Sequence, residues 1–269
     1  MDNILSVFSY SFMTNAFVAG TLISICAALL GVILVLKRYS MIGDGLSHVG
    51  FGALSLATVL GFSPLTVAIP VVVIAALMLM RINESSKIKG DAAIGLISTG
   101  ALAFGIIIVS AAGVNADLNS YLFGSILSLN ITDMYLCVIL CVVVCILYVV
   151  LYNKIFSVTF DETFSKASGM KTGVYNSVIA VITAITIVLG MRMMGALLIS
   201  ALIIFPALTA MRVCKTFKTV SIFSAVISVF CFLSGIMISF TYSTPTGATV
   251  VAVNIVLFFI FNLIMFLKK

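Results

Sequence analysis

Long apolar runs separated by short polar connections dominate the chain. The stretches Ile179–Met191 and Val250–Leu267, for example, contain no charged residue. A helix needs about 20 such residues to cross about 30 Å of hydrocarbon, whereas the strands of a transmembrane barrel alternate apolar and polar residues. The pattern therefore predicts about nine membrane-spanning helices, at residues 12–36, 41–60, 64–80, 91–112, 133–153, 174–190, 195–211, 219–241 and 246–267.

The composition supports the same fold class and excludes a soluble enzyme. Of the 269 residues, 63% are hydrophobic and only 8% are charged, whereas soluble domains carry about 25% charged residues. No internal repeat, linker or low-complexity stretch divides the chain. We therefore expect one all-α, polytopic membrane domain over residues 1–269, with about eight to nine transmembrane helices.

The charge pattern predicts the orientation of this domain. The chain has 14 Lys and Arg against 8 Asp and Glu, a net charge of +6, and Lys and Arg in short loops mark the cytoplasmic side. Placing the N-terminus outside and the C-terminus in the cytoplasm leaves only Arg192 on the outer side. The basic excess is thus explained by membrane topology, and no nucleic-acid partner is expected. The cytoplasmic clusters are Lys37–Arg38, then Arg81, Lys87 and Lys89, then Lys154, Lys166 and Lys171, then Arg212, Lys215 and Lys218, and Lys268–Lys269.

The second predicted span carries two ionisable groups, and such groups are costly inside a membrane unless paired or hydrated. Asp44 and His48 are four residues apart and project from the same helix face. At about 1.5 Å per residue, His48, the only histidine, lies about 15 Å beyond Arg38 and near the bilayer midplane. A carboxylate and an imidazole suit a borderline divalent ion such as zinc. The alternative is an Asp–His hydrogen bond that only fixes helix packing, and we favour the metal interpretation.

The six cysteines lie in or beside apolar spans, so no disulfide framework is expected. Cys137, Cys141 and Cys145 share one helix face. This ladder could hold a soft metal, but the better interpretation is that they are small side chains packed within the membrane.

The longest amphipathic segment outside the spans covers residues 160–171. Asp161 or Glu162 would start a short helix, where an acidic group favours the helix dipole. Ala167 keeps this helix slim, and Gly169 can end it. Geometry alone leaves two interpretations equal: a solvated connecting helix, or a docking element for a cytosolic partner.

No motif for ATP binding or hydrolytic chemistry is present. The P-loop pattern is missing, and its nearest counterpart, Gly169–Thr172, has the wrong spacing. The zinc-protease and serine-hydrolase patterns H-E-x-x-H and G-x-S-x-G are also missing. We therefore expect a chain that is not an enzyme and holds no cofactor of its own.

Four motifs, in order along nearly the whole chain, carry a family resemblance. They are Gly43–His48, Asp117–Gly124, Met194–Ala207 and Thr244–Gly247. With these motifs the chain resembles the membrane permeases of bacterial metal-ion ABC importers, most closely the high-affinity zinc-uptake permeases. The form Tyr-Leu-Phe-Gly that ends the second motif favours zinc over manganese.

The resemblance implies a multi-pass protein of the bacterial cell membrane that works as a homodimer. It also implies two cytosolic ABC ATPase subunits, an extracytoplasmic metal-binding protein, and a coupling helix at about residues 160–170 that grips the ATPase. Two residues depart from the family pattern: Ser243 stands where relatives usually have Asp, and Thr99 where some zinc-type relatives have His.

Together these observations predict the permease subunit of an ATP-driven importer, with Zn²⁺ as the transported ion. Asp44 and His48 are the expected metal ligands, and Asp161, Glu162, Ala167 and Gly169 the expected ATPase contacts. A permease of the same family for Mn²⁺ or iron is the alternative. A self-powered, proton-coupled carrier is disfavoured because only Asp44 and Asp91 could serve a proton relay in the membrane. A membrane scaffold would have no use for an Asp–His pair at the midplane.

Overall fold

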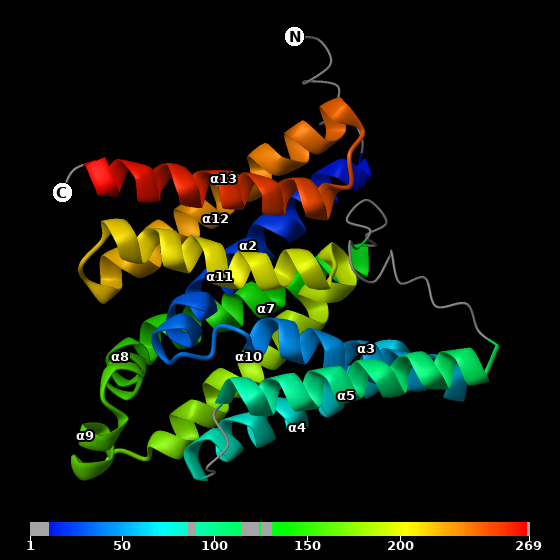
Figure 1. Cartoon of the computed structure of the whole chain (residues 1–269), viewed down its shortest axis with the longest axis horizontal. Coiled ribbons are helices and arrows are strands. Elements are labelled where there is room, and N and C mark those ends of the chain that lie inside the picture. The colour runs from blue at the N-terminus through cyan, green and yellow to red at the C-terminus, as the bar shows by residue number, and fades with distance from the viewer. Residues whose placement is uncertain (1–10, 86–89, 114–123, 125–130, 268–269) are drawn as a thin grey trace.

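The computed structural model describes residues 11–85, 90–113, 124 and 131–267, and the predicted all-α fold is confirmed within them. They form eleven α-helices and no β-strand (Figure 1). The first half contains α2 (Ser11–Leu36), α3 (Ile42–Leu60), α4 (Pro64–Ser85), α5 (Gly90–Ala111), α7 (Ile131–Val150) and α8 (Tyr152–Phe160). The second half contains α9 (Glu162–Ala167), α10 (Thr172–Met194), α11 (Ala196–Val213), α12 (Phe217–Tyr242) and α13 (Thr246–Leu267).

Each of the predicted spans coincides with a long helix. Among the described residues, seven helices are long and apolar enough to cross a membrane, or eight if α7 and α8 count as one broken span bent by 73°. The helix α3 is long enough but is not one of these seven, because the polar side chains of Asp44, Ser47 and His48 lower its mean hydropathy. The molecule is therefore a multi-pass membrane protein.

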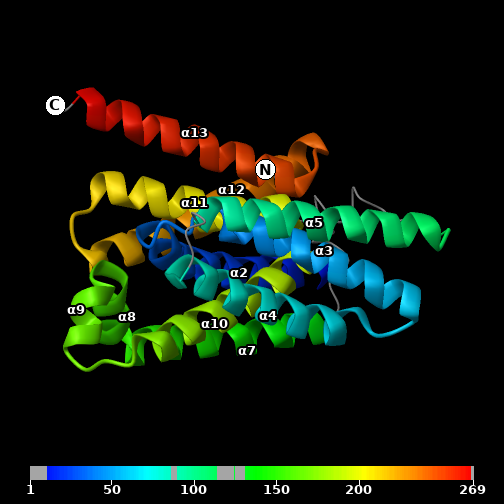
Figure 2. The same cartoon turned by 60° about the horizontal axis from the view of Figure 1, so that its bottom comes forward.

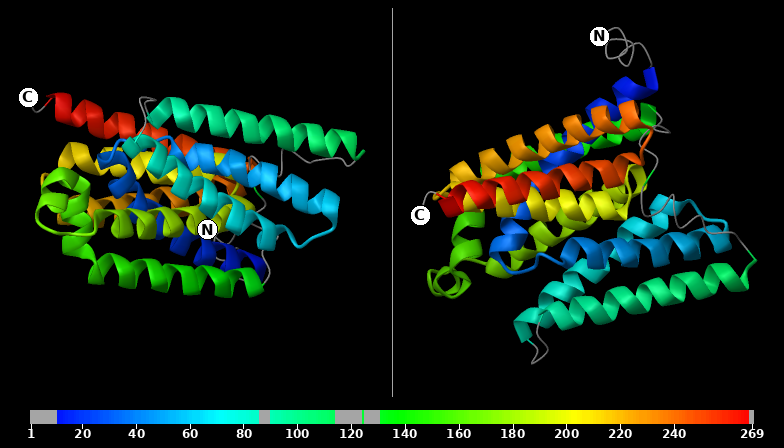
Figure 3. Two further views of the ribbon diagram at one scale, coloured as in Figure 1. Left: turned by 90° about the horizontal axis from the view of Figure 1, so that it is seen from below. Right: turned by 45° about the horizontal axis from the view of Figure 1, so that its top comes forward.

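Successive long helices run in opposite directions, so the bundle has two distinct ends. The helices α8 and α9 lie at the end where α2 and α13 finish, and α10 starts there (Figures 1 and 3). Arg192, in the last turn of α10, lies at the opposite end. At the α9 end, Lys37 follows α2 and Lys171 precedes α10, while Arg81 lies near the end of α4 and Arg212 in the last turn of α11. Arg192 is thus separated from the other basic residues, as the charge pattern predicts. The assignment of the α9 end to the cytoplasm stays a prediction.

The helix α2 occupies the centre of the bundle and packs against α7, α10, α11 and α12. Its side chains Ile23, Ile33 and Leu34 are fully buried. The helices α5 and α13 lie at the edges (Figure 2), where Leu96, Phe104 and other large apolar side chains are exposed. Exposed apolar faces of this size suit contact with lipid.

Glycines bring α3 close to its neighbour α5. A Cβ atom on Gly52 would lie 2.7 Å from the carbonyl oxygen of Ala101, and one on Gly105 would lie 2.9 Å from the Cα atom of Gly52. Small residues allow membrane helices to approach at backbone distance. This crossing fixes the position of α3, the helix that carries Asp44 and His48.

Candidate functional site

Asp44 and His48 form a pair on one face of α3, as their spacing predicts. The Nε2 atom of His48 lies 3.5 Å from the Oδ2 atom of Asp44. The Asp44 side chain is 46% exposed and the His48 side chain 22% exposed. The pair is therefore open on one side and closed on the other, which suits a ligand that arrives from the open side.

The other ring nitrogen of His48 has no partner in the described structure. The Nδ1 atom is buried and makes no hydrogen bond. The nearest serine along the helix, Ser47, turns its Oγ atom back to donate to the backbone oxygen of Asp44, at 2.7 Å. A buried nitrogen left without a partner costs about 1–3 kcal/mol.

One copy of the chain supplies only part of a metal site. Within the described ranges, no group of three or more His, Cys, Asp or Glu side chains could hold a metal ion. Zinc takes four ligands, usually in a tetrahedron, and Asp44 and His48 provide two. Within the described residues, Asp44 and His48 therefore supply only part of a complete ligand set.

The two departures from the family pattern lie in different surroundings. Thr99 is exposed on α5, and its hydroxyl donates to the backbone oxygen of Gly95 at 2.6 Å, so its hydrogen-bonding capacity is used within its own helix. Ser243 ends α12 with φ at +52°, a left-handed conformation that Asn and Asp adopt more readily than most residues. The turn after it is held by Ser239, whose hydroxyl donates to the backbone oxygen of Thr244 at 2.6 Å.

The short helix predicted in the 160–170 segment is present as α9. Asp161 is its N-cap, and the Oδ1 atom of Asp161 accepts a hydrogen bond from the backbone N–H of Phe164 at 2.8 Å. Gly169 follows the C-cap with φ at +81°, a conformation in which glycine meets no steric penalty. Phe164 is 67% exposed at the tip. The local structure is the one that the sequence indicates, and the docking role of Asp161, Glu162, Ala167 and Gly169 stays a prediction.

A buried lysine joins α9 to the rest of the bundle. The Nζ atom of Lys37 lies 3.6 Å from the Oε2 atom of Glu162, and the Lys37 side chain is only 6% exposed. The same ammonium group donates to the Oδ1 atom of Asn176 in α10. Glu162 also pairs with Lys166 at 2.9 Å within α9. The sequence pattern does not mark this connection, because Lys37 is one of many basic residues next to an apolar span.

The pKa of Glu162 is shifted below its ordinary value by these neighbours. Partial burial raises the pKa, but the hydrogen bond from Lys166 and the charge of Lys37 lower it by more. The carboxylate therefore stays ionised, and the ion pair that anchors α9 persists at neutral pH.

Two of the four motifs meet at the end of the bundle that carries Arg192. Gly195 separates α10 from α11 with φ at +90°. A Cβ atom on Gly124 would lie 2.6 Å from the backbone oxygen of Met194, so only glycine fits there. The rest of the motif Asp117–Gly124 lies outside the described residues.

The cysteines make ordinary core contacts. The Sγ atom of Cys137 lies 3.1 Å from the Sδ atom of Met193, and Cys141 and Cys145 are 4.0 Å apart. Cys26 and Cys141 are buried in an apolar cluster with Leu30 and Leu189. None of the six cysteines, all of which lie in the described residues, forms a disulfide. These contacts favour the packing interpretation over a soft-metal ladder.

Comparison with known proteins identifies relatives over nearly the whole chain. A model of the ABC 3 transport family matches residues 9–265. The manganese import system permease protein ScaB of Streptococcus gordonii is 28% identical, over 93% of this chain and 90% of its own length. The high-affinity zinc uptake system membrane protein ZnuB of Haemophilus influenzae is 27% identical, over 93% of this chain and 96% of its own. In the solved structure of PsaBC from Streptococcus pneumoniae in complex with Fab, one chain is 29% identical with a TM-score of 0.85, over 96% of this chain and 93% of that one.

Proposed function

We infer that the ion carried by this chain is zinc, on the premise that the chain belongs to the ABC 3 transport family and is the permease subunit of a metal-ion ABC importer. The chain is a transport subunit and not an enzyme, because separate ATPase subunits hydrolyse ATP in such systems. Members of the family also work with a substrate-binding protein, and they are multi-pass proteins of the bacterial inner membrane.

The observation that carries the choice of ion is the Asp44–His48 pair. A carboxylate and an imidazole whose Oδ2 and Nε2 atoms lie 3.5 Å apart on a half-open helix face are ligands that zinc accepts. The 46% exposure of the Asp44 side chain supports a pair that can reach a ligand over one that only packs. The relative ZnuB, a high-affinity zinc uptake protein, agrees with this choice.

The missing ligands are assigned to a second copy of the chain. If the twofold axis of a homodimer passes beside α3, two Asp44 carboxylates and two His48 imidazoles face each other. Two carboxylates and two imidazoles make a four-ligand set of the kind zinc prefers. An isologous dimer is the commonest symmetric assembly, and it would use the same open face of both copies.

Transport requires that this four-ligand site be transient. The substrate-binding protein would deliver the ion at the end of the bundle that carries Arg192, and the two α3 helices would bind it only in one conformational state. A site that held zinc in every state could not release it.

The helix α9 is assigned to the ATPase. It projects from one end of the bundle (Figure 1), exposes Phe164, and is fixed to α2 and α10 through Lys37. Because its tip is exposed and its base is fixed to the bundle, α9 can pass a movement of the ATPase on to α2 and α10. We therefore retain Asp161, Glu162, Ala167 and Gly169 as the docking segment.

Manganese is the second candidate, because ScaB is as similar to this chain as ZnuB is. Manganese favours oxygen ligands more strongly than zinc does, and zinc tolerates sulfur. Replacing His48 by Cys should therefore separate the two ions.

The test is metal uptake in a strain that lacks its own zinc and manganese importers and carries this permease with its ATPase and binding protein. We expect uptake of zinc at low external concentration, and expect His48→Cys to keep part of it while any manganese uptake is lost. Manganese uptake without zinc uptake would assign the permease to the second candidate.

A further inference from the structure

A wide groove runs along the side of the bundle, away from the Asp44–His48 pair. It has a volume of about 1120 Å³ and is bordered by α4, α7 and α10, which lie together in Figures 2 and 3. Its walls are mainly aliphatic and include Ile74, Met78, Val143, Leu147, Val181 and Ile185. Ile74, Met78 and Val143 are 58%, 54% and 43% exposed, so the groove opens towards the surroundings of the bundle.

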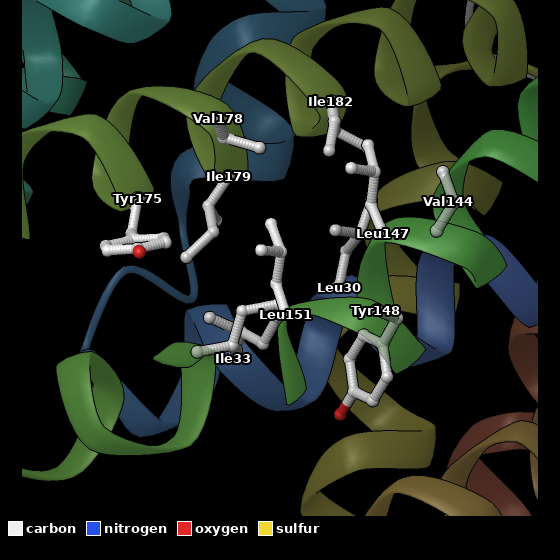
Figure 4. Close-up of a pocket in the computed structure, with 11 residues that line it drawn as sticks. Leu30, Ile33, Val144, Leu147, Tyr148, Leu151, Tyr175, Val178, Ile179 and Ile182 are labelled. Carbon is white, nitrogen blue, oxygen red and sulfur yellow. The ribbon is translucent and has the colours of Figure 1, made fainter. Parts of the chain in front are cut away.

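The floor of the groove is a thin layer of side chains. Leu147, Val178 and Ile182 border both the groove and a small apolar cavity of about 20 Å³ behind it (Figure 4). Ile33 and Leu151 line that cavity but do not line the groove (Figure 4). A cavity with such a lining stays dry. The floor is therefore apolar on both sides, which suits a hydrocarbon chain and excludes a hydrated ligand along most of the groove.

One end of the groove is cationic. Arg81, near the end of α4, and Lys171, the N-cap of α10, both line it and are both exposed. The helices α4 and α10 pack together in opposite directions, which places these two residues at the α9 end. No acidic residue is among the described residues that line the groove. The ligand should therefore combine an anionic group at this end with an apolar body.

We propose that this groove binds an anionic phospholipid of the cytoplasmic leaflet, with its phosphate between Arg81 and Lys171 and an acyl chain along α7 and α10. The membrane presents such a molecule in the required orientation, because basic residues at the cytoplasmic interface lie level with the headgroups. A free phosphate would leave the apolar length of the groove unused. A zwitterionic lipid would gain less from the two cations.

The affinity for lipid should depend on the two cations in a predictable way. Each basic residue near an anionic membrane surface strengthens binding by about fivefold. Replacing both Arg81 and Lys171 by Gln should therefore weaken binding of phosphatidylglycerol by about 25-fold. Binding of phosphatidylethanolamine should change by less than about twofold.

The experiment is native mass spectrometry of the permease purified with its ATPase, titrated separately with phosphatidylglycerol and phosphatidylethanolamine. The matched control is Arg212→Gln with Lys215→Gln, which removes the same charge at the same end from exposed residues outside the groove. We expect this control to bind phosphatidylglycerol as the wild type does. An equal loss in both double variants, or no loss in Arg81→Gln with Lys171→Gln, would overturn the proposal.

A second variant tests the apolar part of the groove. Ile74→Trp fills the groove and should reduce binding of both lipids, whereas Val226→Trp, at an exposed position of α12 outside the groove, should not. Inorganic phosphate should fail to displace the bound phosphatidylglycerol. Displacement by inorganic phosphate, or unchanged lipid binding in Ile74→Trp, would contradict the proposal. Either result would show that Arg81 and Lys171 bind a phosphate group without help from the apolar walls of the groove.

Discussion

The ammonium group of Lys37 lies 3.6 Å from the carboxylate of Glu162, across 125 residues of sequence, and so ties the end of α2 to the helix α9. Lys37 is followed within a few residues by α3, which begins at Ile42 and carries Asp44. A displacement of α9 therefore has a short route to Asp44 and His48, the proposed metal ligands: from Glu162 to Lys37, through the turn after α2, and into the first turn of α3. Asn176 holds the same ammonium group and links α10 to this route.

We expect the variant Lys37→Met to hydrolyse ATP with its partner subunits while importing little metal. Without the ammonium group of Lys37, Glu162 loses its ion pair with the residue that follows α2, and the route to α3 is broken. Breaking a buried ion pair from one side costs about 3–5 kcal/mol, so stability should fall as well. The measurement is the number of ATP molecules hydrolysed per ion imported, compared with Lys154→Met, which removes an exposed lysine of α8. A normal ratio in Lys37→Met at matched membrane levels would contradict the proposed route.

The contribution of Glu162 to stability should depend on pH in one direction. Its pKa is lower in the folded protein than its ordinary value of 4.5, because Lys166 and Lys37 outweigh the effect of burial. The ionised form is favoured by folding, so its stabilisation is complete above the unfolded pKa and is lost as pH falls through the folded pKa. The melting temperatures of wild type and Glu162→Gln should therefore differ by a constant amount between about pH 8 and 6, and converge below the ordinary pKa. A difference that already disappeared at neutral pH would refute this assignment.

The variant Ala167→Arg should separate ATP hydrolysis from transport. Ala167 is the last residue of α9, and a long cation there would hold the ATPase away from the helix. The variant should insert normally, since exposed helix ends tolerate such changes within about 0.5 kcal/mol. Lys166→Arg, one residue earlier in the same helix, is the matched control and should transport normally. ATP-driven uptake at the wild-type rate in Ala167→Arg would remove the docking role of α9.

The crossing of α3 and α5 should be sensitive to a single methyl group. A Cβ atom on Gly105 would lie 2.9 Å from the Cα atom of Gly52 and 3.1 Å from the ring of Phe51, so Gly105→Ala must push the two helices apart. We expect a loss of about 1–3 kcal/mol from overpacking. Gly100→Ala, in the same helix with no atom within 4 Å of the new Cβ, should instead gain about 0.5–1 kcal/mol from the lower flexibility of the unfolded chain. Thermal unfolding of the two variants should show these opposite signs, and equal shifts would contradict the crossing.

The sequence predicted the spans well because each is defined locally, by an uninterrupted apolar run. The predicted span 246–267 matches α13 (Thr246–Leu267), and 219–241 matches α12 to within two residues at each end. The Asp44–His48 pair and the caps of α9 were predictable for the same reason, since spacing along one helix places both.

Contacts between distant segments could not be predicted in this way. The bend of 73° between α7 and α8 follows directly on an apolar run that looks continuous. The hydrogen bond from Lys37 to Asn176 joins residues 139 apart, and nothing in the hydropathy pattern marks either partner. In the sequence, Gly124 and Gly195 belong to two separate motifs. In the structure they are neighbours, because a Cβ atom on Gly124 would collide with the backbone at Gly195.

The central claim is that Asp44 and His48 carry the ion, and zinc uptake by the double variant Asp44→Asn with His48→Ala tests it most directly. Both side chains lie on the open face of α3, so the variant should fold, insert and assemble with the ATPase. The account predicts that assembly persists while uptake is abolished, because the paired copies lose all four ligands. Zinc uptake at the wild-type rate in this double variant would show that the pair only packs the helix, and would contradict the account.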